Sequence, residues 1–299
     1  MDLSERLDFF RFHLEHCTLC PRQCGVNRLA GESGVCKAGV RLKVASYCLH
    51  RGEEPPISGT AGSGTIFFSH CGLNCVYCQN YPISQLGYGN TIDVADLVGM
   101  MLELQDKGAH NINLVTATHF LPQVVEAIAG ARRKGLSVPV ISNTSGYERP
   151  EIISMLDGLI QVYLVDMRYA GSESARLYSN AADYPQVNRA AVREMLKCVG
   201  PLSCTAGLAT SGVAIRHLLL PTLIEETRQI LAFIARELPR SVPVSLMTQY
   251  FPANRAFDYP AINRKITPDE RRQAISLLDE YGIEHGWVQD ARPQDRPVA

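Results

Sequence analysis

The chain has 299 residues, of which 46% are hydrophobic and 20% charged, and its formal net charge at pH 7 is -1. This composition supports a sizeable core in one large α/β domain or two ordinary domains, and it argues against a general nucleic-acid or membrane-surface binder. No apolar run of about 18 residues predicts a transmembrane helix. The N-terminus lacks the basic and apolar regions of a signal peptide. We therefore expect a cytoplasmic protein with no membrane or nucleic-acid partner.

The sequence changes character near residue 63. A short helix is predicted over residues 4–15, and residues 17–62 are rich in Cys, Gly and Pro with little helical periodicity. We therefore expect an N-terminal helix and cysteine-rich metal-binding segment at residues 1–62, followed by a core with a C-terminal extension at residues 63–299.

In the predicted core, short apolar runs alternate with amphipathic stretches. The apolar runs read as buried parallel strands: GTIFFSH, INLVTATH, VPVISNT, LIQVYLVDMR, VAIRHLLLP and VPVSLMTQYF. Helix signals separate them, including Asp93 as an N-cap and a capping box at Thr267 and Glu270. Six βα units are too few for a closed eight-stranded barrel. The sequence therefore predicts an open, partial (β/α)6 barrel.

Three cysteines follow the first predicted strand, in the stretch SHCGLNCVYCQNYPISQ. Cys71, Cys75 and Cys78 have the spacing C-x3-C-x2-C, whereas a closed tetrahedral thiolate site needs four ligands. Three thiolates on a four-iron cluster would leave one iron without a protein ligand, as catalytic metal sites leave a position open. The loop is placed beyond the carboxyl end of a strand, where such folds bind ligands.

This motif, with the aromatic Tyr77 before its last cysteine, resembles that of the radical S-adenosylmethionine (SAM) superfamily. The resemblance implies a [4Fe-4S] cluster on the three cysteines, with SAM on the open iron. One electron, from a donor such as flavodoxin or ferredoxin, would cleave SAM to methionine and a 5′-deoxyadenosyl radical that abstracts hydrogen from a substrate.

A narrower resemblance covers most of residues 17–290. The stretches CPRQCGVNRLAGESGVCKAG, GTIFFSHCGLNCVYCQNYPISQ, GAHNINLVTATHF and NTSGYE resemble the branch related to pyruvate formate-lyase activating enzyme. Within that branch they resemble a subgroup with an extra N-terminal cysteine cluster. The implied substrate is a glycyl-radical enzyme, although related activating enzymes carry their extra cysteines after the SAM-cluster loop rather than before it.

Polar residues near the strand ends are candidates for SAM binding. Strand two ends in VTATH, which departs from the superfamily's Gly-Gly-Glu pattern, and strand three ends in SNTSG. Hydroxyl, carbonyl, amide and imidazole groups there suit the polar groups of SAM. Strand four ends in a charged pair that resembles the Asp-x-Lys of related activating enzymes. The candidates are Tyr77, Thr116, Thr118, His119, Asn143, Thr144, Ser145, Asp166, Arg168 and Arg216, with turn capping, packing or a structural ion pair as the alternative roles.

A second cysteine set, Cys17, Cys20, Cys24 and Cys36, has the spacing C-x2-C-x3-C-x11-C. Four thiolates can close a zinc site or hold a second Fe–S cluster, and both remain open. Either metal would stabilise a segment that has little core of its own. The other three cysteines are expected to be small buried apolar residues: Cys48, Cys198 and Cys204.

Two classes of function follow. The first is a radical SAM enzyme that acts on a glycyl-radical enzyme or, alternatively, on a small molecule, peptide or nucleoside. The second is a non-enzymatic interaction protein in which both cysteine sets are zinc knuckles. Arg22 and Arg28 lie near the upstream set, but no aromatic residue accompanies them, which disfavours single-strand nucleic-acid binding. Iron with sulfide would support the enzyme, and zinc alone the interaction protein.

Overall fold

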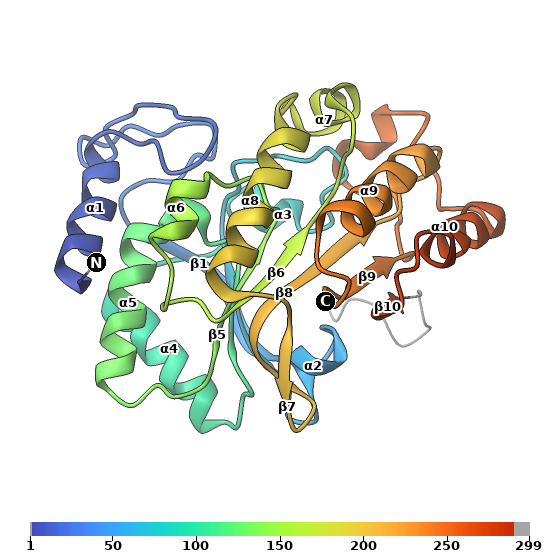
Figure 1. Cartoon of the computed structure of the whole chain (residues 1–299). Helices are drawn as coiled ribbons and strands as arrows, with labels where there is room; N and C mark the ends of the chain where they lie inside the picture. The colour runs from blue at the N-terminus through green and yellow to red at the C-terminus, as the bar shows by residue number, and fades with distance from the viewer. Residues whose placement is uncertain (1, 290–299) are drawn as a thin grey trace.

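One mixed β-sheet organises the computed structural model, which describes residues 2–289 (Figure 1). Its strand order is β10-β9-β8-β6-β5-β4-β2-β1-β3, and β7 pairs with β8 outside that path. The six strands predicted from the sequence are β2, β4, β5, β6, β8 and β9, and they pair in parallel in that order. Within the described part of the chain the two outer strands of this order do not pair with each other. The predicted open α/β sheet is thus confirmed.

The elements have the following bounds. The strands are β1 (Leu42–His50), β2 (Ser63–Phe68), β3 (Asn90–Ile92), β4 (Ile112–Val115), β5 (Val140–Thr144), β6 (Val162–Asp166), β7 (Ser203–Thr205), β8 (Leu208–Leu218), β9 (Val244–Met247) and β10 (Gly286–Gln289). The helices are α1 (Leu3–Glu15), α2 (Pro55–Ser58), α3 (Tyr81–Ser84), α4 (Val94–Asp106), α5 (Leu121–Arg133), α6 (Pro150–Ser154), α7 (Ser172–Ser179), α8 (Tyr184–Val199), α9 (Ile224–Glu237) and α10 (Pro268–Glu280), with 3-10 turns at Thr118–Phe120 and Asn254–Asp258.

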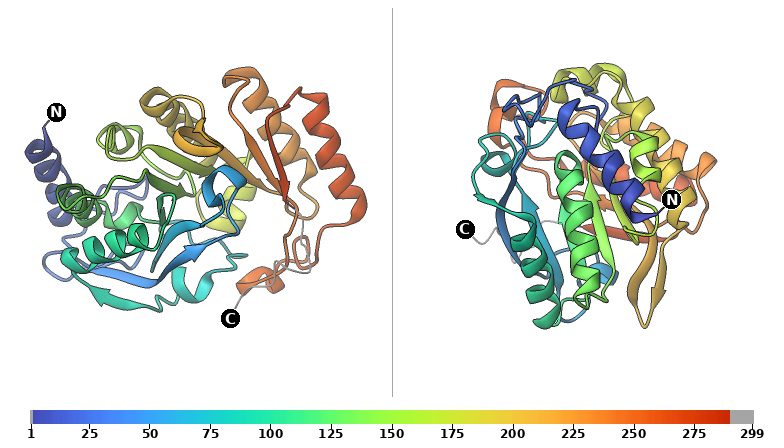
Figure 2. Two further views of the ribbon diagram at one scale, coloured as in Figure 1. Left: turned by 90° about the horizontal axis from the view of Figure 1, so that it is seen from below. Right: turned by 90° about the vertical axis from the view of Figure 1, so that its left-hand side faces the viewer.

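The sheet is curved, and the longer helices lie on its outer side when the molecule is seen from below (Figure 2). β6 is buried along its whole length. Burial of both faces explains why the central strands read as continuous apolar runs. The two predicted caps are also confirmed: Asp93 accepts a hydrogen bond from the N–H of Asp96, and Thr267 accepts one from the N–H of Glu270. No helix among the described residues is long and apolar enough to cross a membrane.

Several elements were not expected from the sequence, among them β1, α2 and β10. β1 lies inside the segment with little helical periodicity and pairs antiparallel with β2. α2 lies inside a stretch interpreted as loop, and its two prolines occupy the first helical positions, where proline is tolerated. β10 adds a further parallel strand beside β9. The domain division at residues 62 and 63 remains a prediction, and residues 290–299 of the predicted core lie outside the described residues.

The inner face of the sheet is partly filled by α2. Ile57 is fully buried there and belongs to a small apolar cluster with Ile141, Val162, Leu164, Ala209 and Ala214. The side chain of Asn111 donates a 2.7 Å hydrogen bond to the carbonyl of Ile57 and so fixes the helix beside the start of β4. Because this end is packed with apolar side chains, polar ligands are directed to the carboxyl ends of the strands.

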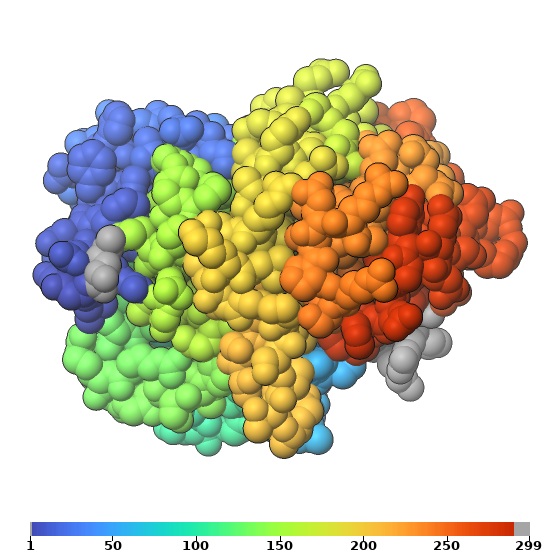
Figure 3. Space-filling view, viewed as in Figure 1, coloured from blue at the N-terminus to red at the C-terminus, as the bar shows by residue number. Residues whose placement is uncertain are grey.

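The N-terminal segment 16–41 covers part of the carboxyl-end edge of the sheet, next to α1 (Figures 1 and 3). Two arginines attach it through main-chain carbonyls. Arg28 is 1% exposed and donates to the carbonyls of His119, at 2.7 Å, and Gly39. Arg22 donates to the carbonyls of Gly72 and Ser179, each at 3.0 Å. Charged donors to carbonyl oxygens are stronger than neutral ones, so this attachment is substantial although the segment has little apolar core.

The β7–β8 hairpin yields a test of the fold. Gly212 has φ +109°, and a Cβ there would lie 2.2 Å from the carbonyl oxygen of Pro201. Gly207 also has a positive φ, but nothing lies within 4 Å of the position that a Cβ would take there. We expect Gly212→Ala to lower the free energy of unfolding by about 2 kcal/mol or more, and Gly207→Ala to cost about 1 kcal/mol. Thermal unfolding of both variants measures this, and equal midpoints would contradict the steric argument.

Candidate active site

The three cysteines of the C-x3-C-x2-C motif lie on the loop between β2 and α3, at the carboxyl-end edge. Main-chain bonds hold the loop at its start, where the N–H of His70 bonds the carbonyl of Ile83, and in its middle, where the N–H of Val76 bonds the carbonyl of Tyr178. His70 and Asn74 have φ values of 74° and 55°, in the left-handed region. Non-glycine residues in this region tend to occur where the surrounding structure imposes a functional conformation.

Each of the three sulfurs has a hydrogen-bond partner. The N–H of Leu73 donates to Cys71 Sγ at 3.4 Å, and Ser84 Oγ lies 3.2 Å from Cys78 Sγ. Two side chains donate to Cys75 Sγ: the hydroxyl of Ser179 at 3.1 Å and Nη1 of Arg168 at 3.4 Å. Hydrogen bonds to sulfur are a recurrent means of stabilising thiolates that hold Fe–S clusters. The donor set therefore fits a thiolate-ligated cluster.

Burial governs the protonation of these thiols. It raises the pKa of Cys71 and raises that of Cys78 to about 11. As free thiols both are therefore protonated at neutral pH, and metal binding has to release their protons, since the thiolate is the ligand.

A small cavity of about 30 Å³ lies beside this loop, at the carboxyl ends of β4 and β5. It is lined by Cys20, Cys36, Cys71, Gly72, Leu73, Thr116, Thr118, His119, Ser145 and Tyr147. Four candidate SAM-binding residues thus lie around one cavity with the first motif cysteine. Thr116 has φ +59°, an outlier for a β-branched residue. This volume is far below the roughly 300 Å³ or more of pockets that hold drug-sized ligands.

Several candidates already have partners within the chain. The hydroxyl of Thr118 donates to Glu148 at 2.5 Å, and the ring of His119 bonds the carbonyl of Ser69 at 2.8 Å. The hydroxyl of Thr144 accepts from the N–H of Gly146, which is a turn-capping role. Burial lowers the pKa of His119 to about 3 and raises that of Glu148. The sequence analysis missed Glu148, because a single carboxylate after NTSGY carries no spacing signal.

A group of charged side chains occupies the ends of β6 and β8. Asp166 pairs with Arg168 at 2.5 Å and with Arg216 at 2.9 Å. Burial raises the pKa of Asp166, but the two guanidiniums outweigh it and hold the pKa below its usual range. The predicted common face of Asp166 and Arg168 is thus confirmed.

Arg216 extends this group to two further elements. Its side chain also donates to Asn143 on β5 and lies 3.4 Å from Glu53, in the loop before α2. Glu53 was missed by the sequence analysis, because it lies in a stretch interpreted only as loop.

Tyr77 lies in a cluster of buried tyrosines. Its ring packs edge-on against those of Tyr169, Tyr178 and Tyr250. Burial raises its pKa well above the ordinary value, so the phenol stays neutral. This packing covers the motif loop near Cys75, and it favours a shielding role for Tyr77 over direct contact with SAM.

The upstream cysteines lie next to the motif loop. A methyl group placed on Gly72 would lie 3.8 Å from Cys20 Sγ, and the N–H of Val35 donates to Cys24 Sγ at 3.4 Å. Burial raises the pKa of Cys20 to about 12, and the neighbouring Cys36, Cys17 and Cys24 add to that rise. Among residues 2–289, no three His, Cys, Asp or Glu side chains are arranged to hold a single metal ion, and this finding covers both cysteine sets. Both metal sites therefore stay predictions.

The prediction for the three separate cysteines was wrong. Cys48 and Cys204 are exposed and Cys198 is only half-buried. Cys48 lies in β1 near the edge of the sheet, and Cys204 lies in β7, whose residues are all exposed. A strand near an edge or in a projecting hairpin leaves side chains in solvent, which the local sequence does not reveal.

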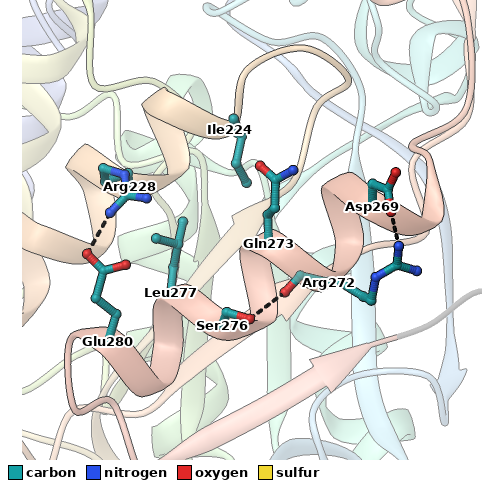
Figure 4. Close-up of a pocket in the computed structure, with 8 residues that line it drawn as sticks. All are labelled: Ile224, Arg228, Asp269, Arg272, Gln273, Ser276, Leu277 and Glu280. Atoms are coloured by element: carbon teal, nitrogen blue, oxygen red, sulfur yellow. Dashed lines mark hydrogen bonds and ion pairs between the residues drawn. The ribbon is translucent and has the colours of Figure 1, made fainter.

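A larger hollow, of about 400 Å³, lies between α9 and α10 (Figure 4). Its polar side chains are engaged with one another: Arg228 pairs with Glu280, and Arg272 pairs with Asp269. None of the candidate residues lines it. The site therefore remains at the carboxyl-end edge of the sheet.

One family model matches the part of the chain that contains the three-cysteine motif. The family model of the radical SAM superfamily matches residues 65–167, from β2 to just beyond β6. Residues 65–167 are therefore similar to that family. The superfamily implies an enzyme with a [4Fe-4S] cluster that binds SAM, and all three motif cysteines lie within the match.

A relative and several solved structures show similarity at low identity. An uncharacterised protein of Methanocaldococcus jannaschii is 28% identical over 293 residues, which cover 94% of this chain and 80% of that protein. A domain of pyruvate-formate lyase-activating enzyme from Bacteroides vulgatus is 14% identical and has a TM-score of 0.41, over 57% of this chain and 92% of that one. Methylornithine synthase is 12% identical, with a TM-score of 0.47, over 77% of this chain and 71% of its own.

His119 gives a pH-dependent prediction for the stability of the folded chain. Its pKa is about 3 in the folded protein, below the ordinary value of 6.5. The unfolded chain therefore binds an extra proton between these values, so the stability is present above pH 6.5 and is lost as the pH falls toward 3. We expect His119 to make the free energy of unfolding fall by about 1.4 kcal/mol for each pH unit below 6.5. His119→Gln should remove this dependence. Urea unfolding between pH 7.5 and 5 measures the slope, with exposed His285→Gln as control; parallel slopes in all three proteins would contradict this assignment.

Proposed function

We propose that this protein is a radical SAM enzyme and that Cys71, Cys75 and Cys78 hold its [4Fe-4S] cluster. The observation that carries the proposal is that one loop within the matched residues carries the three sulfurs, and that each sulfur has a hydrogen-bond partner. With these groups bound, the cofactors would supply reductive cleavage of SAM and abstraction of a hydrogen atom from the substrate. The chain itself binds, orients and shields them.

The proposed SAM site is the edge formed by the ends of β4, β5, β6 and β8. Thr116 and Ser145 line the cavity beside Cys71, so they are placed to bind polar groups of SAM. Thr118 and His119 line it too, with their side chains held by Glu148 and by the carbonyl of Ser69. The Asp166, Arg168 and Arg216 group contributes fixed charges whose geometry is set before any ligand arrives. The tyrosines around Tyr77 exclude water from the side of Cys75.

For the substrate, we propose a glycyl-radical enzyme as the first candidate and a small molecule, peptide or nucleoside as the second. The resemblance of four sequence stretches to the activating-enzyme branch supports the first. The position of the extra cysteines before the SAM-cluster loop, rather than after it, favours the second. A one-electron carrier such as flavodoxin or ferredoxin is the proposed reductant.

We further propose that Cys17, Cys20, Cys24 and Cys36 form a second metal site. Their thiols are close enough to influence one another's ionisation, and Cys20 and Cys36 line the same cavity as Cys71. The chemistry of four thiolates suits zinc and an Fe–S cluster alike. Because segment 16–41 is fixed mainly by arginine–carbonyl bonds and has a small core, a bound metal would cross-link it and stabilise its fold.

Removal of a motif cysteine tests the cluster assignment. We expect Cys71→Ala, Cys75→Ala and Cys78→Ala each to lower 5′-deoxyadenosine formation to background, because a three-thiolate cluster has no replacement ligand. The measurement uses protein reconstituted anaerobically with iron and sulfide, then dithionite and SAM. Exposed Cys48→Ala is the matched control and should keep full activity. Wild-type protein that carries an intact cluster yet forms no 5′-deoxyadenosine would refute the enzymatic proposal.

The upstream site is tested in the triple variant Cys71→Ala/Cys75→Ala/Cys78→Ala, which leaves that site intact. Its metal content after anaerobic purification should be either about one zinc, or about four irons with sulfide, per chain. Adding Cys20→Ala and Cys36→Ala should remove the metal, whereas adding Cys204→Ala should not. A triple variant that holds neither metal would contradict the second site.

A further inference from the structure

Cys75 has a different environment from the other two motif cysteines. Cys71 is bonded by one main-chain N–H and Cys78 lies against one serine hydroxyl, whereas Cys75 accepts from both Ser179 and Arg168. Cys75 is also the most buried of the three, at 5% exposure. The strongest electrostatic influence on the motif is therefore concentrated on one sulfur.

The donor from Arg168 is charged, and the fold holds it in place. Its Nη2 pairs with Asp166 at 2.5 Å while its Nη1 reaches Cys75 Sγ at 3.4 Å. Its main-chain N–H is bonded to the hydroxyl of Tyr184, which itself donates to the carbonyls of Ser145 and Asp166. The planar guanidinium thus bridges a carboxylate and a sulfur, a geometry that a lysine ammonium cannot reproduce with the same two nitrogens.

Ser179 supplies a second hydrogen bond to Cys75, and this donor is neutral. Its hydroxyl donates to Cys75 Sγ at 3.1 Å and is bonded at 2.7 Å to the hydroxyl of Tyr169. Both Ser179 and Tyr169 are buried. Water therefore does not compete for this sulfur from that side, and the fixed donors determine its electrostatic environment.

We propose that Arg168 is a positioning residue that raises the reduction potential of the cluster by donating a charged hydrogen bond to Cys75. The inference rests on the proposed cluster site and deepens it. Reduction by one electron adds one negative charge to the cluster, with dithionite as the electron source in the test. A positive charge and a hydrogen bond at a ligating sulfur stabilise the reduced form more than the oxidised form. This role differs from the contact with SAM that the sequence resemblance implies for this position.

The direction in which each substitution changes the reduction potential of the cluster distinguishes this role of Arg168 from a structural one. Arg168→Gln removes the charge, so the reduced form becomes less stable. Asp166→Asn keeps an amide oxygen that can accept a hydrogen bond from the guanidinium and removes the negative charge beside it, so the reduced form becomes more stable. Ser179→Ala removes a neutral donor and should act in the same direction as Arg168→Gln, but more weakly, because charged hydrogen bonds are about twice as strong.

The experiment is a redox titration of the anaerobically reconstituted protein without SAM, followed by electron paramagnetic resonance. At a fixed applied potential, we expect Arg168→Gln to lower the ratio of reduced to oxidised cluster about tenfold, which equals about 59 mV for a one-electron couple. Asp166→Asn should raise this ratio, and Arg168→Lys should lower it less than Arg168→Gln does. Arg193→Gln is the matched control on the surface of α8, where the arginine pairs with Glu237, and should leave the ratio unchanged.

The outcomes separate the two proposals. A wild-type protein that assembles no cluster overturns both. If wild type and Arg168→Gln both assemble a cluster and the two clusters have the same reduction potential, the role of Arg168 is overturned. The proposed cluster site is then unaffected. If Arg168→Gln fails to assemble a cluster, the reduction potentials of Asp166→Asn and Ser179→Ala decide between the outcomes. Shifts of opposite sign in the two variants support the proposal. Shifts of the same sign, or no shift, overturn it.

Discussion

The buried carboxylate of Asp166 is the interaction on which the rest of the site depends. It lies at the end of β6 and binds two guanidiniums, one of which reaches the motif loop while the other reaches β5 and the loop before α2. Removing one partner from such a group would leave an uncompensated buried charge, which is costly. The ion pairs therefore fix the relative positions of strand ends that separate βα units supply.

This network is possible because the strands beneath it are almost wholly apolar. The parallel strands β5 and β6 bury both faces, and the concave side at the amino ends is filled by α2. Polar side chains are consequently confined to the last residues of each strand and the loops beyond. The same division places the cysteine loop, the small cavity and the charged group along one edge.

Much of this arrangement follows from the sequence, and the reasons are local. A strand that is buried on both faces appears in the sequence as an apolar run, so such strands can be predicted. The helix caps at Asp93 and Thr267 place a polar residue at a fixed spacing, so the starts of those helices can be predicted too. β1 and α2 were missed because their surroundings are dominated by Cys, Gly and Pro, which mask a strand whose pairing is set by distant residues. At the site, spacing identified the motif cysteines, and strand alternation placed Asp166 beside Arg168. No local pattern pointed to Ser179, Glu148 or Glu53, because their partners lie 30 to 163 residues away in the sequence.

The attachment of segment 16–41 affects how iron, sulfide and SAM would reach the proposed site. The bonds of Arg22 and Arg28 end on main-chain carbonyls, and the segment contributes only a few side chains to the main apolar core, among them Leu19 and Ala38. Such a segment can open locally without unfolding the sheet below it. Iron, sulfide and SAM would then enter while it is open, and its closure would seal the sulfurs from oxidants in solution. Oxygen sensitivity of the assembled protein would accordingly depend on the mobility of segment 16–41 as well as on the cluster.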